Sequence, residues 1–80
     1  MHESHLLKNI FQFLEKEEDT SHKKIKKIYL SISQFSGLSR EHFMEHYRIA
    51  SSGTKWEDLE IDIKRVPFGP ELEINRLDFV

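Results

Sequence analysis

The chain has 80 residues, no cysteine and a formal net charge of −2. This length fits one domain, and the lack of cysteine excludes disulfides and thiolate zinc sites within it. The weak negative charge argues against a general binder of nucleic acid or anionic membranes. No apolar run reaches membrane-spanning length and no signal-peptide pattern is present, so we expect a cytoplasmic protein.

The first predicted element is a helix from Ser4 to about Glu18. Its apolar residues recur at spacings of three and four, which indicates one buried face; they are Leu6, Leu7, Ile10, Phe11 and Leu14. Thr20 and Ser21 are expected to end the helix. The lysines between positions 23 and 27 form a basic patch, which we interpret as the solvated start of a strand because the whole chain is acidic.

Residues 28–34 alternate between apolar and polar side chains, which predicts a strand with one buried face. After a turn at residues 36–38, Ser39 is typical of a helix N-cap. The second helix is expected to end at about Ser51. Its predicted inner face consists of Phe43, Tyr47 and Ala50.

Two further strands are predicted near the end of the chain. Leu59, Ile61 and Ile63 alternate with charged residues, and the sequence Pro-Phe-Gly-Pro at 67–70 then turns the chain. The last strand, residues 72–79, changes phase, which indicates a bulge near Asn75 or a strand covered on both sides. We expect these two strands to form an antiparallel hairpin.

The elements together predict a single domain over residues 1–80. Its class is α/β (α+β), a two-layer sandwich of two helices on a three-stranded sheet in the order α-β-α-β-β.

A candidate metal site lies at the start of the chain. The Met1 amine, the His2 backbone nitrogen and the His2 imidazole can close adjoining chelate rings on one ion, and the Glu3 backbone nitrogen could add a fourth donor. Four nitrogens in a plane suit nickel(II) or copper(II). Many chains with histidine at position 2 bind no metal there, so these residues alone favour the absence of a site.

The other histidines add weaker signals. His5 lies close enough to His2 in sequence to reach the same ion, or it is a solvated helix residue; both interpretations stay open. His42 and His46 are one helical turn apart, a spacing that can bind a metal, but a polar outer face is the favoured interpretation. Trp56 is interpreted either as an exposed residue of a contact surface or as a side chain that covers the edge of the sheet, and both interpretations remain open. No residue pattern for catalysis is present, so we expect no enzyme.

An ordered set of short motifs resembles the HypA/HybF family of nickel metallochaperones. The set starts with Met1-His2-Glu3 and continues through a Phe-Ser-Gly-Leu turn at 35–38 and a Gly-Thr turn at 53–54. The intervening apolar and acidic positions also match; they are Ile25, Ile28, Leu30, Ile32, Glu41, Phe43, Tyr47, Glu57, Ile61, Ile63, Val66 and Pro67.

This resemblance implies that Met1, His2 and Glu3 bind nickel(II) for the maturation of a nickel enzyme such as [NiFe]-hydrogenase. It also implies a HypB-like GTPase and the hydrogenase large subunit as partners. The sequence itself leaves the oligomeric state open, a homodimer included.

The chain departs from the family pattern after Pro67. The family carries a zinc domain with paired cysteines there, whereas this sequence has a short turn at 67–70, so no zinc is expected. Ser4 and His5 also replace residues that the family prefers. The competing hypothesis is a metal-independent protein-interaction or regulatory module that keeps the fold.

Overall fold

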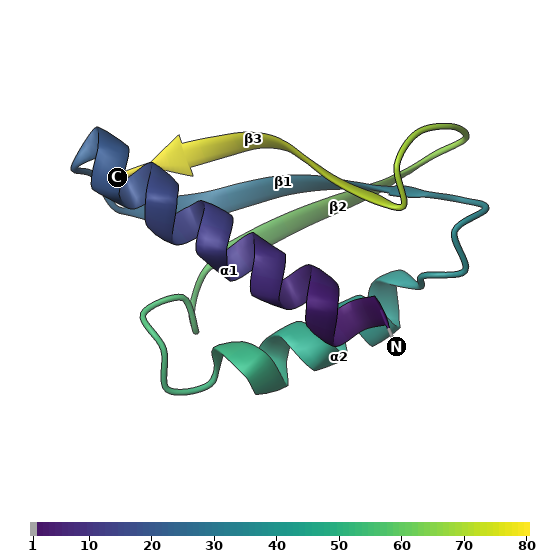
Figure 1. Cartoon of the computed structure of the whole chain (residues 1–80), viewed down its shortest axis with the longest axis horizontal. Helices are drawn as coiled ribbons and strands as arrows, with labels where there is room; N and C mark the ends of the chain where they lie inside the picture. Colours follow the sequence, from purple (N-terminus) through teal and green to yellow (C-terminus); the bar gives the residue numbers. More distant parts are fainter. Residues whose placement is uncertain (1) are drawn as a thin grey trace.

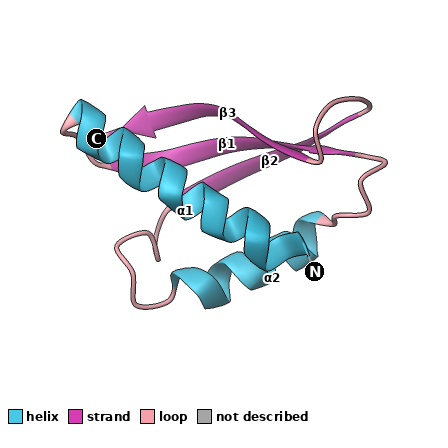
Figure 2. Cartoon of the chain, viewed as in Figure 1, coloured by secondary structure: helices cyan, strands magenta, loops and turns pink. Residues whose placement is uncertain are grey.

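The computed structural model describes the backbone from His2 to Val80 and the side chains from His5 onward. Its elements follow the predicted order, with bounds α1 His2–Ser21, β1 Ile25–Ser33, α2 Arg40–Ser51, β2 Glu60–Val66 and β3 Leu72–Phe79. Two helices share one core with a three-stranded sheet, which confirms the predicted two-layer architecture (Figure 2). Within residues 2–80, neither helix combines the length and the apolar character that crossing a membrane requires.

Helix α1 is longer than the sequence predicted. It starts at His2 and continues through the acidic run to Ser21, and His22 follows with a positive φ of 59°. Leu7, Ile10 and Leu14 are buried, as their spacing predicted. Strand β1 also starts earlier than expected, at Ile25, so Lys26 and Lys27 belong to the strand.

The predicted hairpin of the last two strands is wrong. The strand order is β2-β1-β3, with β1 parallel to β2 and antiparallel to β3. Strands β2 and β3 are therefore the two edges of the sheet, separated by β1 (Figure 1). The parallel pair is joined through α2, as a crossover connection requires.

The physical reason lies in the outward-facing residues of the three strands. Ser31 and Ser33 on β1 are buried even though they face away from the helices. The corresponding positions of β2 are charged, with Asp62 paired to Tyr29 and Lys64 paired to Ser31 in the register. Charged outward positions are typical of edge strands, so β1, whose outward residues from Tyr29 to Ser33 carry no charge, takes the centre.

The connection from β2 to β3 passes over the end of β1. On one side the Gln34 amide donates to the Val66 carbonyl at 2.8 Å, and on the other the Ser33 amide donates to the Glu71 carbonyl at 3.2 Å. Both ends of residues 67–71 are thus tied to the central strand.

The change of phase in β3 is a bulge, as one of the two sequence interpretations predicted. Tyr29 pairs with Arg76 while Leu30 pairs with Ile74, so Asn75 is the extra residue. The Asn75 amide donates a hydrogen bond to the Ser31 hydroxyl. Because of the bulge, apolar residues on both sides of it reach the core; they are Leu72, Ile74, Leu77 and Phe79.

Helix α2 begins as predicted, because the Ser39 hydroxyl accepts a hydrogen bond from the His42 amide. Its buried residues are Phe43, Tyr47 and Ser51, which recur every four positions. Ala50, expected on the inner face, is exposed, because a spacing of three from Tyr47 carries it past the edge of the buried stripe.

Candidate metal centre

The predicted chelating residues stand at the start of α1. Met1 and the side chains of His2 and Glu3 lie outside the described residues, so their role stays a prediction. The helix itself starts at His2. The first four backbone N–H groups of a helix have no acceptor within it, so the amides of His2 and Glu3 belong to a part of the helix where nitrogen atoms are open to other partners.

His5 is exposed on α1. Between His5 and Val80, no three side chains of histidine, cysteine, aspartate or glutamate gather closely enough to hold a metal ion. A complete set of side-chain ligands therefore does not exist in that part of the chain, and ligation by His5 stays a prediction.

The histidine pair of α2 is exposed, in agreement with the predicted polar outer face. The ring centroids of His42 and His46 lie 6.4 Å apart, with an angle of 86° between the ring planes. The neighbouring face of this helix is fixed in the core by Phe43 and Tyr47, which are almost fully buried. The two imidazoles therefore project from a well-anchored helix.

A groove lies between the first half of α1 and the second half of α2. Its volume is about 500 Å³, and its lining is mainly apolar; the lining residues are Leu7, Lys8, Phe11, Gln12, His46, Ile49 and Ala50. Ile49 is 73% exposed at its rim. Of the described histidines, His46 is the one that lines this groove, and the sequence carried no signal for that placement.

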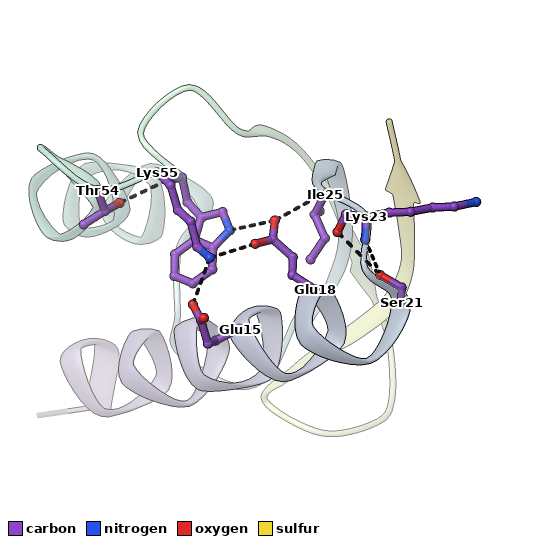
Figure 3. Close-up of polar contacts among 8 residues, drawn as sticks. Glu15, Glu18, Ser21, Lys23, Ile25, Thr54 and Lys55 are labelled. Atoms are coloured by element: carbon purple, nitrogen blue, oxygen red, sulfur yellow. Dashed lines mark hydrogen bonds and ion pairs between the residues drawn. The ribbon is translucent and has the colours of Figure 1, made fainter.

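The far end of α1 is closed by a polar cluster around Glu18 (Figure 3). One Glu18 carboxylate oxygen accepts hydrogen bonds from the Ile25 amide at 2.9 Å and from the Trp56 indole at 3.4 Å. The other lies 2.9 Å from the Lys55 ammonium. Burial raises the pKa of Glu18, but the bonds from Ile25, Lys55 and Trp56 outweigh that effect and leave the pKa below its usual range.

Trp56 is buried, so the interpretation of it as an exposed contact residue is wrong. Its ring stacks on Phe11 at 5.5 Å with an interplanar angle of 5°. Its carbonyl oxygen accepts a hydrogen bond from the Tyr47 hydroxyl at 2.7 Å. The indole thus fills the space between the end of α1 and the loop after α2, and it covers core rather than offering a surface.

The sequence of this chain matches a known family. The family model described as hydrogenase/urease nickel incorporation, metallochaperone, hypA, matches residues 1–72. The chain belongs to the HypA family. HypA proteins are metallochaperones that act with other maturation proteins, and the matched region of this HypA chain includes both its first residues and the connection at 67–71.

A solved structure supports the same fold. The HypA chain is similar to the solution structure of the Ni metallochaperone HypA from Helicobacter pylori, with a TM-score of 0.82 and 13% sequence identity. The match covers 100% of this chain and 98% of that chain. A search of curated proteins finds no match. At this identity the structural likeness establishes the fold, while the family model establishes the membership.

Proposed function

We propose that this chain carries nickel(II) to a nickel enzyme such as [NiFe]-hydrogenase and binds the ion through Met1, His2 and Glu3. Met1 supplies its amine, His2 its backbone nitrogen and imidazole, and Glu3 its backbone nitrogen. The observation that carries the proposal is the family match, which begins at residue 1 and so includes these donors.

The local backbone is compatible with this role. Nickel(II) bound to amide nitrogen displaces the amide proton, which would be costly if that proton were held in a helix hydrogen bond. The amides at the start of α1 have no such bond to lose, because α1 starts at His2. Four nitrogen donors in a plane suit nickel(II) or copper(II) better than zinc(II), and the chain has no thiolate to offer zinc.

Proton competition gives the proposed site a defined pH dependence. An α-amine has an ordinary pKa of about 8 and an imidazole one of about 6.5, and both must be unprotonated to bind. Nickel affinity should therefore rise with pH across this interval.

A HypB-like GTPase and the hydrogenase large subunit are the proposed partners. Two exposed aromatic residues offer contact area, Phe35 at 77% and Phe68 at 82% exposure. They come from the connections that follow β1 and β2, which are parallel neighbours, so both connections leave the same end of the sheet. This observation also favours the second candidate, an interaction module that keeps these contacts without a metal.

The deciding experiment is a nickel titration of untagged protein whose free Met1 amine has been verified by mass spectrometry. Two variants run beside it: His2→Ala, which removes the imidazole, and a chain extended by Gly-Ser before Met1, which moves the amine away. Calorimetry gives stoichiometry and affinity, absorbance reports planar diamagnetic nickel, and metal analysis of the same sample reports zinc.

We expect tight one-to-one binding with the planar spectrum in the native chain and its loss in both variants. Planar binding that survives His2→Ala would eliminate these donors. Absence of planar nickel in the native chain, together with partner binding that tolerates His2→Ala, would favour the interaction module.

A further inference from the structure

The exposed flank of α2 carries a pair of metal-binding side chains outside the proposed amino-terminal site. His42 and His46 are one turn apart on a helix that Ser39 caps and Phe43 and Tyr47 anchor. Side chains at this spacing lie on the same face of a helix, with about 5–6 Å between their Cβ atoms. Two histidines so placed can bind one divalent ion.

The two imidazole rings lie slightly farther apart than one shared ion requires. A metal–imidazole bond of about 2.1 Å places the ion roughly 3.2 Å from a ring centroid, so two rings at adjacent positions of one ion have centroids about 4.5–5 Å apart. The centroids of His42 and His46 are 6.4 Å apart. Both side chains are exposed, so small rotations can bring one nitrogen from each ring to the same ion.

The pair also lies near the start of α1. His46 lines the groove together with Leu7 and Lys8, and the two helices run in the same general direction along the sheet (Figure 1). With a rise of about 1.5 Å per residue, the first residue of α1 lies about 8 Å beyond the level of Leu7, and His42 lies about 6 Å beyond His46 in the same direction. The pair and the start of α1 therefore lie toward the same end of the groove.

We propose that His42 and His46 form a second nickel(II) site, separate from the amino-terminal donors. The choice of nickel rests on the proposed function, since imidazole also suits zinc and copper. Two protein ligands leave the remaining coordination positions to water, and Lys8 in the same groove opposes a cation. Binding is therefore weaker than at the amino terminus and readily reversible, which suits an ion that must be passed on.

The spin state of nickel(II) separates the two sites experimentally. A planar ion with four nitrogen ligands is diamagnetic and leaves neighbouring amide signals sharp. An ion held by two imidazoles and water is six-coordinate and paramagnetic, and it broadens the signals near it. Titration of the uniformly ¹⁵N-labelled chain with nickel alone, followed by ¹H–¹⁵N correlation spectra, therefore reads out the second site directly.

The titration uses the native chain, His2→Ala, the double variant His42→Ala with His46→Ala, the single variant His46→Ala, and His22→Ala as a matched exposed control. We expect selective broadening of α2 and of the groove residues around Lys8 in the native chain, His2→Ala and His22→Ala. The broadening should be lost in the double variant and mostly lost in His46→Ala. Dispersed spectra before nickel addition show that each variant is folded.

Two results would overturn the site: no selective broadening of α2 in the native chain, or broadening that persists in the double variant. The proposed function fails separately. If planar nickel never forms but the α2 signals broaden, the amino-terminal site is wrong and the His42–His46 site stands. If planar nickel forms but the α2 signals stay sharp, the amino-terminal site stands and the His42–His46 site is wrong.

Discussion

The two ends of α1 contrast sharply. At the far end, Glu18 joins the Ile25 amide, Lys55 and the Trp56 indole, and the indole stacks on Phe11. Near the start, a groove separates α1 from α2. The closed end keeps the helix on the sheet, while the open end holds the residues proposed to bind nickel. We therefore expect substitutions around Glu18 and Trp56 to change stability without changing nickel affinity.

Of the proposed substitutions, removal of the Trp56 indole should lower the free energy of unfolding the most, because it disrupts the packing at the far end of α1. Trp56→Ala leaves a cavity beneath Phe11 and removes the donor to Glu18. We expect a loss of about 3–5 kcal/mol in the free energy of unfolding, measured by urea denaturation followed by circular dichroism. A loss below about 1 kcal/mol would show that the closed end does not hold the helix. In the fraction that remains folded, nickel affinity should be unchanged.

Glu18→Gln tests the charge at the same end, and we expect a loss of about 1–2 kcal/mol at pH 7. Because the folded pKa of Glu18 lies below its ordinary value, its charge stabilises the fold above the ordinary carboxyl pKa of about 4.3. That contribution disappears as the pH falls through the lower folded pKa. Urea denaturation at a series of pH values should therefore show the stabilities of wild type and variant converging in acid.

Glu15→Gln is the matched control for that series. Glu15 also pairs with Lys55, at 3.1 Å, but its side chain is 51% exposed whereas that of Glu18 is 11% exposed. An exposed ion pair contributes little, so the control should change stability by less than about 0.5 kcal/mol at every pH. Equal effects of the two substitutions would contradict the importance of the buried network.

The smallest effect is expected at the exposed rim of the groove. Ile49→Ser replaces a largely exposed side chain at the rim of the groove, and the free energy of unfolding should change by no more than about 0.5 kcal/mol. Leu7→Ala, on the buried side of the same groove, should cost about 2–5 kcal/mol by the same denaturation measurement. A large effect of Ile49→Ser would mean that the groove is closed by packing in solution.

Periodicity predicted the elements well because it reports which side chains are buried. The apolar stripe of α1, the Ser39 cap and the bulge at Asn75 were all available from local patterns. Strand order was not available from local patterns. The short turn at 67–70 favours a hairpin locally, whereas the charges on β2 and β3 favour edge positions for these two strands. The outward residues Tyr29, Ser31 and Ser33 carried a usable signal, since an uncharged outward stretch is typical of a central strand and charged outward positions are typical of edges.

The candidate site divides in a similar way. The donors Met1, His2 and Glu3 follow from nitrogen chemistry and family resemblance, and they need no tertiary structure to be named. The contacts of Glu18 with Trp56, and of His46 with the groove, join residues far apart in sequence. No spacing rule relates such pairs, so only the folded arrangement could reveal them.

The connection at 67–71 has a mechanical consequence. Its two ends are bonded to the same central strand from opposite sides, so they are separated by two strand spacings, about 10 Å. Any domain inserted there would be connected to the sheet through two anchored chain segments, one at each end of the insertion. Two anchored segments restrict rotation of the insertion about the strand direction and leave mainly a hinge motion about the line that joins them. The orientation of an insertion at this position would therefore be set by β1.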